Sequence, residues 1–219
     1  MSPFPHRVLV LFAHPALEAS RINRRLIAAP QQIEGITFHD LYQEYPDFDV
    51  DCEAEQSLLT DHDVVIFQHP FYWYSAPPLV KQWQDLVLEH GWAYGNDGTA
   101  LQDKLTLHVI TAGGPEAAYT RAGGNHYTLA ELLRPFEATA TLCGMDFLPP
   151  FVVHGTHSLH GETLERHVAD YRRLLLALRD GTLDRERARQ VSRLNADLDA
   201  LLDDPPGSSM NEARTGGDE

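Results

Sequence analysis

The sequence predicts an α/β protein with a doubly wound parallel sheet. Short runs of apolar residues, typical of buried strands, alternate along the chain with longer amphipathic stretches, typical of helices. No apolar run approaches the roughly 20 residues of a membrane span. Because strands that alternate with helices form parallel sheets with right-handed crossovers, we expect one sheet with helices on both faces.

Five segments are predicted to be strands. The first, residues 7–13, is a continuous apolar run that ends at a His-Pro pair. The third, residues 62–68, has the apolar centre Val64-Val65-Ile66-Phe67. The fifth, residues 147–154, is interrupted by Pro149-Pro150, which lack a backbone N–H. The other two strands are predicted at residues 35–41 and 105–111.

The predicted helices lie between these strands, at residues 20–29, 51–60, 77–90, 128–141 and 162–179. Ser20 is the expected N-cap of the first helix, and Pro30 its expected end. Trp83 lies at helical spacing from Leu79 and Leu86, so we expect it in the core. Five such βα units fit the flavodoxin-like strand order 2-1-3-4-5.

The chain divides into three parts by composition. Residues 1–181 are predicted to form the α/β domain. Residues 182–202 are rich in arginine and leucine, and we expect a helical extension that packs on a partner subunit or on the domain. Residues 203–219 are rich in Pro, Gly and Ser and are predicted to be disordered.

Charge and cysteine content exclude several function classes. The formal net charge of −15 disfavours nucleic-acid partners and anionic lipid surfaces. Cys52 and Cys143 form no C-x-x-C pair, so a thiolate metal cage is not expected, and both are interpreted as buried thiols. Residues 1–7 lack the pattern of a signal peptide. We therefore expect a cytoplasmic protein.

Ligands of such sheets bind where strands one, three and four end, and each of these strands is followed by a distinctive loop. The first loop, residues 14–23, leads into a helix whose free N–H groups can bind a phosphate. Ser20 and Asn23 can add hydrogen bonds, and His14 or Arg21 can add charge. Alternatively, Ser20 is only an N-cap.

The second loop contains four consecutive aromatic residues, Phe71-Tyr72-Trp73-Tyr74, after Gln68-His69-Pro70. A loop rarely exposes so much ring area without a partner to pack against it. A flat conjugated ligand such as isoalloxazine would bind to this surface. The alternative is a subunit interface, where aromatic residues are also enriched.

The third loop begins with Thr111-Ala112-Gly113-Gly114, whose small residues allow a ligand close to the backbone. Tyr119 and His126 follow and could lie over the face of a bound ring and transfer protons. The alternatives are a tight turn for the Gly-Gly pair and ordinary surface positions for the other two residues.

A metal-dependent hydrolase is a weaker hypothesis. Residues 8–18 are similar to the opening of zinc-dependent N-deacetylases, but Ala16-Leu17 replace the metal-binding Asp pair. His154, His157 and His160 lack regular helical spacing and nearby cysteines, so we interpret them as surface histidines. The prediction for metal ligands is therefore none.

Several longer motifs carry a family resemblance. In chain order they are Ala13-His14-Pro15 with Ser20 and Asn23, Leu41-Tyr42-Gln43, Tyr45-Pro46-Asp47-Phe48, Gln68-His69-Pro70, Trp73-Tyr74-Ser75-Ala76-Pro77-Pro78, His90-Gly91-Trp92-Ala93-Tyr94-Gly95, Gly98-Thr99-Ala100-Leu101, Cys143-Gly144 and Leu148-Pro149-Pro150-Phe151. Over residues 7–178 the chain resembles the flavodoxin-2 family of NAD(P)H:quinone oxidoreductases, and within it the ancillary oxidoreductases of glutathione-regulated potassium efflux systems (the Kef type).

This resemblance implies a bound FMN, with FAD disfavoured because residues 1–181 contain no adenosine-binding extension. Its phosphate would contact His14 and residues 20–23, namely Ser20, Arg21, Ile22 and Asn23. The isoalloxazine would contact Pro70, Phe71, Tyr72 and Trp73, and its polar edge Thr111, Ala112, Gly113 and Gly114. The resemblance also implies a homodimer, with Tyr119 and His126 as catalytic residues, although the place of the histidine is shared between positions 125 and 126.

The expected reaction is a hydride transfer from NAD(P)H to FMN, followed by a two-electron transfer to a quinone. Pro115 replaces a glycine of the Kef-type proteins, and one backbone donor is lost there. The second hypothesis is a flavin-binding redox sensor with little turnover that regulates a potassium/proton antiporter. Its place would be the cytoplasmic face of the membrane.

Overall fold

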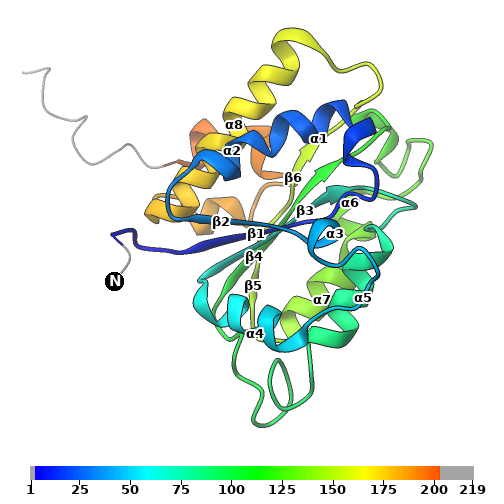
Figure 1. The fold of residues 1–219 in the computed structure, drawn as a ribbon. Helices are drawn as coiled ribbons and strands as arrows, with labels where there is room; N and C mark the ends of the chain where they lie inside the picture. The colour runs from blue at the N-terminus through cyan, green and yellow to red at the C-terminus, as the bar shows by residue number, and fades with distance from the viewer. Residues whose placement is uncertain (1–2, 203–219) are drawn as a thin grey trace, which may run out of the picture.

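A parallel sheet forms the centre of the molecule (Figure 1), and the computed structural model describes residues 3–202 of the chain. Its strands are β1 (Val8–Phe12), β2 (Ile36–Asp40), β3 (Val64–Pro70), β4 (Leu105–Thr111), β5 (Asp146–Phe147) and β6 (Phe151–Val153). The order is β2-β1-β3-β4-β5, and β6 also pairs with β4. The predicted doubly wound order 2-1-3-4-5 is confirmed. Its fifth position is divided between β5 and β6 because Pro149 and Pro150 cannot donate to the ladder.

Helices cover both faces of the sheet (Figure 1). On one face lie α1 (Arg21–Leu26), α2 (Ala28–Gln32) and α8 (Gly161–Asp180). On the other lie α3 (Leu41–Glu44), α4 (Cys52–Asp61), α5 (Pro78–Val87), α6 (Leu129–Leu132) and α7 (Arg134–Leu142). Within residues 3–202, none of the helices combines the length and the apolar character that crossing a bilayer requires.

Two predicted helices are each split in the structure. The first breaks at Ile27. We had predicted that Pro30 ends this helix, but Pro30 lies inside α2. The helix predicted at residues 128–141 breaks at Leu133, before Pro135 in the first turn of α7. Proline is tolerated in a first turn because the N–H it lacks would have no partner there.

On the face of the sheet that α4 and α5 cover, the core contains the buried carboxylate of Glu55. Trp83 is buried on α5, as predicted, and its indole N–H donates to Glu55 Oε2 at 2.7 Å. Glu55, on α4, also accepts from the Tyr45 hydroxyl and pairs with His39 on β2, both at 2.6 Å. Three partners thus compensate the desolvation of this carboxylate. Cys143 is buried as expected, whereas Cys52 is only half-buried.

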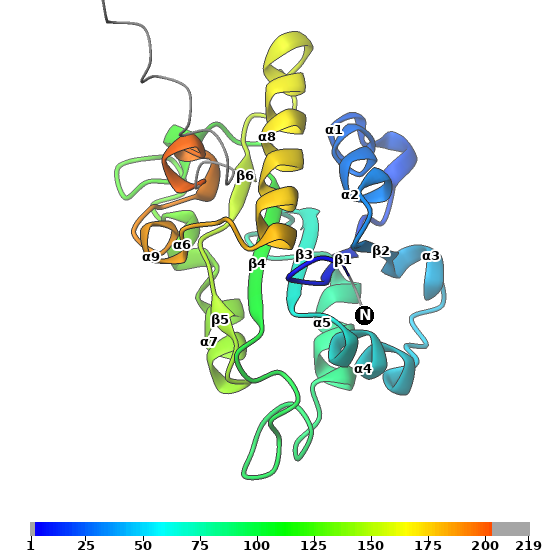
Figure 2. The same ribbon diagram turned by 90° about the vertical axis from the view of Figure 1, so that its left-hand side faces the viewer.

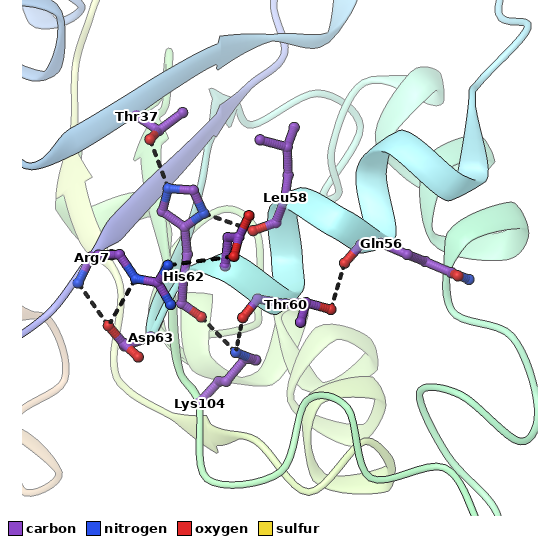
Figure 3. Close-up of polar contacts among 9 residues, drawn as sticks. Arg7, Thr37, Gln56, Leu58, Thr60, His62, Asp63 and Lys104 are labelled. Carbon is purple, nitrogen blue, oxygen red and sulfur yellow. Dashed lines mark hydrogen bonds and ion pairs between the residues drawn. The ribbon is translucent and has the colours of Figure 1, made fainter. Parts of the chain in front are cut away.

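The amino ends of β1, β3 and β4 are joined by a second polar cluster (Figure 3). The backbone N–H of Arg7 donates to Asp63 at 2.8 Å. Lys104 donates to the carbonyl of His62, just past α4, at 2.6 Å. The His62 ring contacts Thr37 on β2 and a carbonyl in the last turn of α4, each at 2.7 Å. These contacts fasten the C-terminal end of α4 to the strands beside it.

The helical extension predicted at residues 182–202 forms short pieces rather than one continuous helix. This segment contains the short helix α9 (Arg185–Ala188) and two 3₁₀ turns, Leu194–Ala196 and Asp199–Leu201. Leu194 and Leu201 are buried in the same core as α8, so the segment packs on the domain. The prediction for residues 203–219 lies outside the described residues.

Candidate functional site

A cavity of about 720 Å³ opens at the carboxyl ends of β1, β3 and β4. Its volume is within the range of small-molecule and cofactor sites. All three loops that the sequence analysis identified reach it. The predicted site residues that line it are His14, Ser20, Arg21, Ile22, Asn23, Pro70, Phe71, Tyr72, Trp73, Thr111, Gly113, Gly114 and Tyr119.

One end of the cavity is polar and is built mainly by the residues after β1. Ser20 caps α1 as predicted, since its hydroxyl accepts the N–H of Asn23 at 3.2 Å. The Asn23 amide donates to Ser20 Oγ at 3.1 Å and to Thr111 Oγ1 on β4 at 3.0 Å. Because both hydroxyl oxygens act as acceptors here, each hydroxyl proton is available for a ligand.

His14 adds an N–H donor to this polar end. Its Nδ1 accepts the backbone N–H of Ala16 at 3.1 Å, which assigns the proton of the neutral ring to Nε2. Burial lowers the pKa of His14, and the nearby Glu18 charge only partly offsets this effect. The neutral imidazole therefore presents one fixed donor.

Arg21 supplies formal positive charge at the same end. Its guanidinium donates to the backbone carbonyl of Thr156 at 3.2 Å. Thr156 and His157 follow β6 and also line the cavity. The contact therefore joins the first turn of α1 to the loop after β6 across the polar end.

The opposite wall is aromatic and follows β3 directly. Phe71 is buried, and its N–H donates to the Thr111 carbonyl at 2.8 Å. Trp73, in contrast, is 94% exposed, and Tyr74 is exposed as well. Both have left-handed backbones, with φ of 49° and 63°, which cost a non-glycine residue about 1–2 kcal/mol each. This loop therefore holds exposed rings at the cavity rim in a strained conformation.

The third wall is formed by Gly113 and Gly114. A Cβ at Gly113 would lie 2.6 Å from His157 Nε2, so a larger residue here would require the exposed His157 side chain to move. Ala112 was predicted to contact the ligand, but it is fully buried behind the wall. Its N–H donates to the carbonyl of Val153 on β6 at 2.9 Å. Ala112 thus supports the wall and does not line the cavity.

Tyr119 lines the cavity above this wall. Its ring packs against Phe71, with 5.9 Å between the ring centroids. Burial raises the pKa of the Tyr119 hydroxyl. The group therefore keeps its proton near neutral pH and can donate a hydrogen bond.

His126 lies outside the cavity wall. Its neighbour Asn125 lines the cavity and accepts a hydrogen bond from the Tyr74 hydroxyl at 3.2 Å. His126 has a left-handed backbone, with φ of 61°, in the turn that starts at Gly123. Between the two positions that the resemblance left open, the structure brings Asn125 to the cavity. The catalytic role of His126 stays a prediction.

Sequence reasoning missed several lining residues. Tyr74 could have been included, because it continues the aromatic run. Thr156 and His157 follow the predicted fifth strand. Because that strand was expected beside the fourth, the residues after it could have been predicted to reach the same cavity. Ala16, Ala19 and Ala118 carry no such signal, since alanine has no chemistry that marks a site.

The histidines considered as metal ligands, His154, His157 and His160, form no metal site within residues 3–202. Over residues 3–202 the structure groups no three His, Cys, Asp or Glu side chains as a metal site. His157 and His160 are exposed, as interpreted from the sequence. His154 is half-buried instead and packs against Tyr119 at 5.5 Å between ring centroids.

Three of the known proteins that are similar to this chain illustrate the relationship. The ancillary protein KefG of the glutathione-regulated potassium efflux system of Serratia proteamaculans is 47% identical over 167 residues, which cover 76% of this chain and 91% of that protein. The general stress protein 14 of Treponema denticola, crystallised in complex with FMN, is 38% identical with a TM-score of 0.73. That match covers 78% of this chain and 99% of the other.

The third is a protein of P. pentosaceus described as an NADPH-quinone reductase, which is 34% identical with a TM-score of 0.71. Here 77% of this chain and 96% of the other are covered. A family model described as a flavodoxin-like fold matches residues 6–175. This range contains the whole sheet and the three loops around the cavity. The chain therefore belongs to the flavodoxin-2 family.

Proposed function

We propose that this chain is an FMN-dependent NAD(P)H:quinone oxidoreductase. The observation that carries the proposal is one cavity with hydrogen-bond donors and Arg21 at one end and aromatic side chains at the other. FMN has the matching parts, a phosphate and a flat ring. The similar chain from T. denticola was solved with FMN, and the similar chain from P. pentosaceus is described as an NADPH-quinone reductase.

The residues present fit FMN. At the polar end, His14, Arg21 and the hydroxyl of Ser20 would bind the phosphate together with the backbone N–H of Ile22. Asn23 Oδ1 is buried and accepts no hydrogen bond from residues 3–202, which suits a hydroxyl of the ribityl chain.

The ring of FMN would lie along the other two walls. The side chains that would contact its faces are Pro70, Phe71, Tyr72 and Trp73, and its polar edge would meet Thr111, Gly113 and Gly114. We propose FMN rather than FAD because the similar chain from T. denticola was solved with FMN.

When bound, FMN supplies the hydride and electron transfer between NAD(P)H and a quinone. The protein supplies position and electrostatics. The Tyr119 hydroxyl, which burial keeps protonated, would donate a hydrogen bond to a substrate oxygen that gains negative charge. His126 is the second proposed catalytic residue, and it would act from the loop in which Asn125 already reaches the cavity.

We propose a homodimer as the subunit arrangement. Trp73 and Tyr74 are exposed at the cavity rim, and exposed aromatic residues are enriched at interfaces. Light scattering coupled to size-exclusion chromatography tests this proposal. A mass of one chain at micromolar concentration would reject it.

The similarity to KefG supports a second candidate, an ancillary role beside a potassium/proton antiporter at the cytoplasmic face of a membrane. In that role the flavin would act as a redox sensor with little turnover. Steady-state quinone reduction separates the two functions. A rate near 10 s⁻¹, roughly the typical enzyme value, favours the enzyme, whereas bound flavin with negligible turnover favours the sensor.

The experiment that tests the proposed function is an absorbance spectrum of the purified protein, taken after incubation with FMN and removal of free flavin. Bands near about 375 and 450 nm are expected to bleach with anaerobic NADPH and to return on addition of a quinone, since this redox change belongs to the flavin. A protein that stays colourless with both FMN and FAD would overturn the proposal.

A further inference from the structure

The C-terminal segment, residues 182–202, lies behind the cavity wall. The family model ends at residue 175, so this segment lies outside the matched region. It nevertheless packs on the core through Leu194, whose N–H donates to the carbonyl of Pro150 at 2.9 Å. In Figure 2 the segment, drawn in orange, lies next to β6. It is therefore placed to act on the strand that supports the wall.

Asn195 binds β6 in the manner of a neighbouring strand. Its Oδ1 accepts the backbone N–H of Val152 at 2.9 Å, and its Nδ2 donates to the carbonyl of the same residue at 2.8 Å. The other side of β6 pairs with β4, whose end carries the Gly-Gly wall. Two hydrogen bonds from one side chain fix the register of the segment, so Arg193, two residues earlier, has a defined position.

Arg193 reaches from this clamp to the loop after β4. Its guanidinium pairs with the carboxylate of Glu116 at 3.0 Å. The Arg193 side chain is 21% exposed and that of Glu116 is 62% exposed, so the pair joins a mostly covered guanidinium to a carboxylate at the surface. Glu116 is the first residue of the 3₁₀ turn Glu116–Ala118, and Tyr119 is its C-cap. The ion pair thus holds the start of a turn that ends at Tyr119.

His154 provides a second connection between the same parts. It follows β6, and its ring packs against the ring of Tyr119 at 5.5 Å. Burial lowers the pKa of His154, the nearby Glu116 charge acts against this effect, and the Arg193 charge acts with it. Segment, strand and turn therefore form one continuous set of contacts behind Tyr119.

We propose that Arg193 is a positioning residue, which holds Tyr119 in the cavity wall through Glu116. This inference rests on the proposed function, because Tyr119 is the group proposed to act on the substrate. Within the turn, the backbone hydrogen bond from Tyr119 to Glu116, at 3.0 Å, is local. The turn also has outside contacts at its end, where the Tyr119 ring packs against Phe71 and His154, but at its start the ion pair is the contact that reaches the C-terminal segment, and a short turn opens more readily when such a contact is removed.

The first test needs no cofactor. Hydrogen–deuterium exchange of residues 113–122 is measured in the full chain without FMN, for the wild type, Arg193→Ala and the control Arg173→Ala. Arg173 pairs with Asp199 in the same segment and contacts neither Glu116 nor Tyr119. We expect exchange about tenfold faster in Arg193→Ala and unchanged in the control. Equal exchange in all three proteins, or equal acceleration in both variants, would overturn the inference.

The second test uses the FMN-loaded enzyme. We expect Arg193→Ala to lower kcat about tenfold with the Kd for FMN unchanged within about twofold, since a small misplacement of a catalytic group is costly. Arg193→Lys should restore most of kcat. Glu116→Gln should match Arg193→Ala, and the double variant should be no slower, because both changes break one contact. Wild-type kcat in Arg193→Ala, or additive losses in the double variant, would contradict the inference.

The two proposals fail separately. If the wild type binds FMN but reduces no quinone, the proposed function fails while the exchange experiment still decides whether Arg193 positions the turn. If the wild type turns over and exchange is the same in every variant, only the positioning role is lost.

Discussion

The segments on either side of strand β3 differ in how their side chains are held: those of α4 are fixed by buried contacts, and those of residues 71–74 are largely exposed. Before β3, α4 is fastened at both ends, at its start by the contacts of Glu55 and at its end by His62 and Lys104 (Figure 3). After it, residues 71–74 leave Trp73 94% exposed on a left-handed backbone. Stability is therefore concentrated before β3, and the binding surface is presented after it.

The largest effect is expected from Glu55→Gln. The amide keeps one oxygen, so its N–H₂ group would face either the donors of His39 and Tyr45 or the indole N–H of Trp83, and the broken buried pair should cost about 3–5 kcal/mol. Urea unfolding measures this loss. Glu53→Gln, on the exposed face of the same helix turn, is the control and should change stability by less than about 0.5 kcal/mol. Equal stability of the two variants would break the contrast between the segments.

On the other side of β3, Tyr119→Phe should slow turnover about tenfold to a hundredfold with FMN still bound, because the hydroxyl donor is lost. His126→Ala should also slow turnover, but by less, since Asn125 rather than His126 lines the cavity. Steady-state kinetics at saturating NADPH measures both. Wild-type rates in both variants would mean that neither residue is catalytic.

Trp73→Ala should weaken FMN binding at least tenfold, or about 1.4 kcal/mol, because it removes ring area from the cavity rim. Fluorescence titration of the purified protein with FMN measures the Kd. The control is Tyr127→Ala, which removes another exposed ring outside the cavity wall. An unchanged Kd for Trp73→Ala would reject the assignment of this loop to the ring.

A smaller effect concerns the stability of the protein rather than FMN binding, and it is expected from the strained backbone of Trp73. Trp73→Gly should be more stable than Trp73→Ala by about 1 kcal/mol, since glycine adopts a φ of 49° without the clash that a Cβ causes. Urea unfolding of the two variants gives the difference. If both unfold at the same denaturant concentration, the loop carries no strain in solution.

The smallest effects concern pH, and two histidines near α4 should act in opposite directions. Burial lowers the pKa of His39, but the hydrogen bond and charge of Glu55 outweigh it, and the pKa lies above 6.5. Its stabilisation is complete below pH 6.5 and is lost as the pH rises through the raised pKa. Burial lowers the pKa of His62, so its contribution is present above pH 6.5 and is lost as the pH falls through the lowered pKa.

Unfolding free energies between pH 4 and 9 test both signs. His39→Gln should flatten the decline on the alkaline side, and His62→Gln the decline on the acidic side. A variant that keeps the slope of the wild type would show that the histidine it replaces does not contribute there.

The regular elements were predictable wherever local pattern and burial agree. The fourth strand was predicted at residues 105–111 and is found at Leu105–Thr111, a β-branched and apolar stretch that is buried throughout in a sheet covered on both faces. The helical extension predicted at residues 182–202 is broken into short pieces for the opposite reason. Its leucines, such as Leu194 and Leu201, meet the core singly from short turns, and no helical spacing in the sequence distinguishes that case.

The same limit applies to the cavity. Residues 20–23 and 70–73 were predictable because each set is contiguous and follows a strand end. Thr156 reaches the polar end only through the arrangement of β6 beside β4 and through the hydrogen bond from Arg21. His126 was chosen for its chemistry, but the backbone turn presents its neighbour Asn125 instead.

The hydrogen bond from the Ala16 N–H to His14 determines how anion binding at the polar end would depend on pH. Because Nδ1 is occupied as an acceptor, Nε2 is the nitrogen that bears the proton in the neutral ring. A second proton, added in acid, would go to Nδ1, where it would leave the Nε2 N–H in place, add charge and end the hydrogen bond from the Ala16 N–H. The imidazole is thus a donor in both of its protonation states, and acidification would strengthen its attraction for a phosphate.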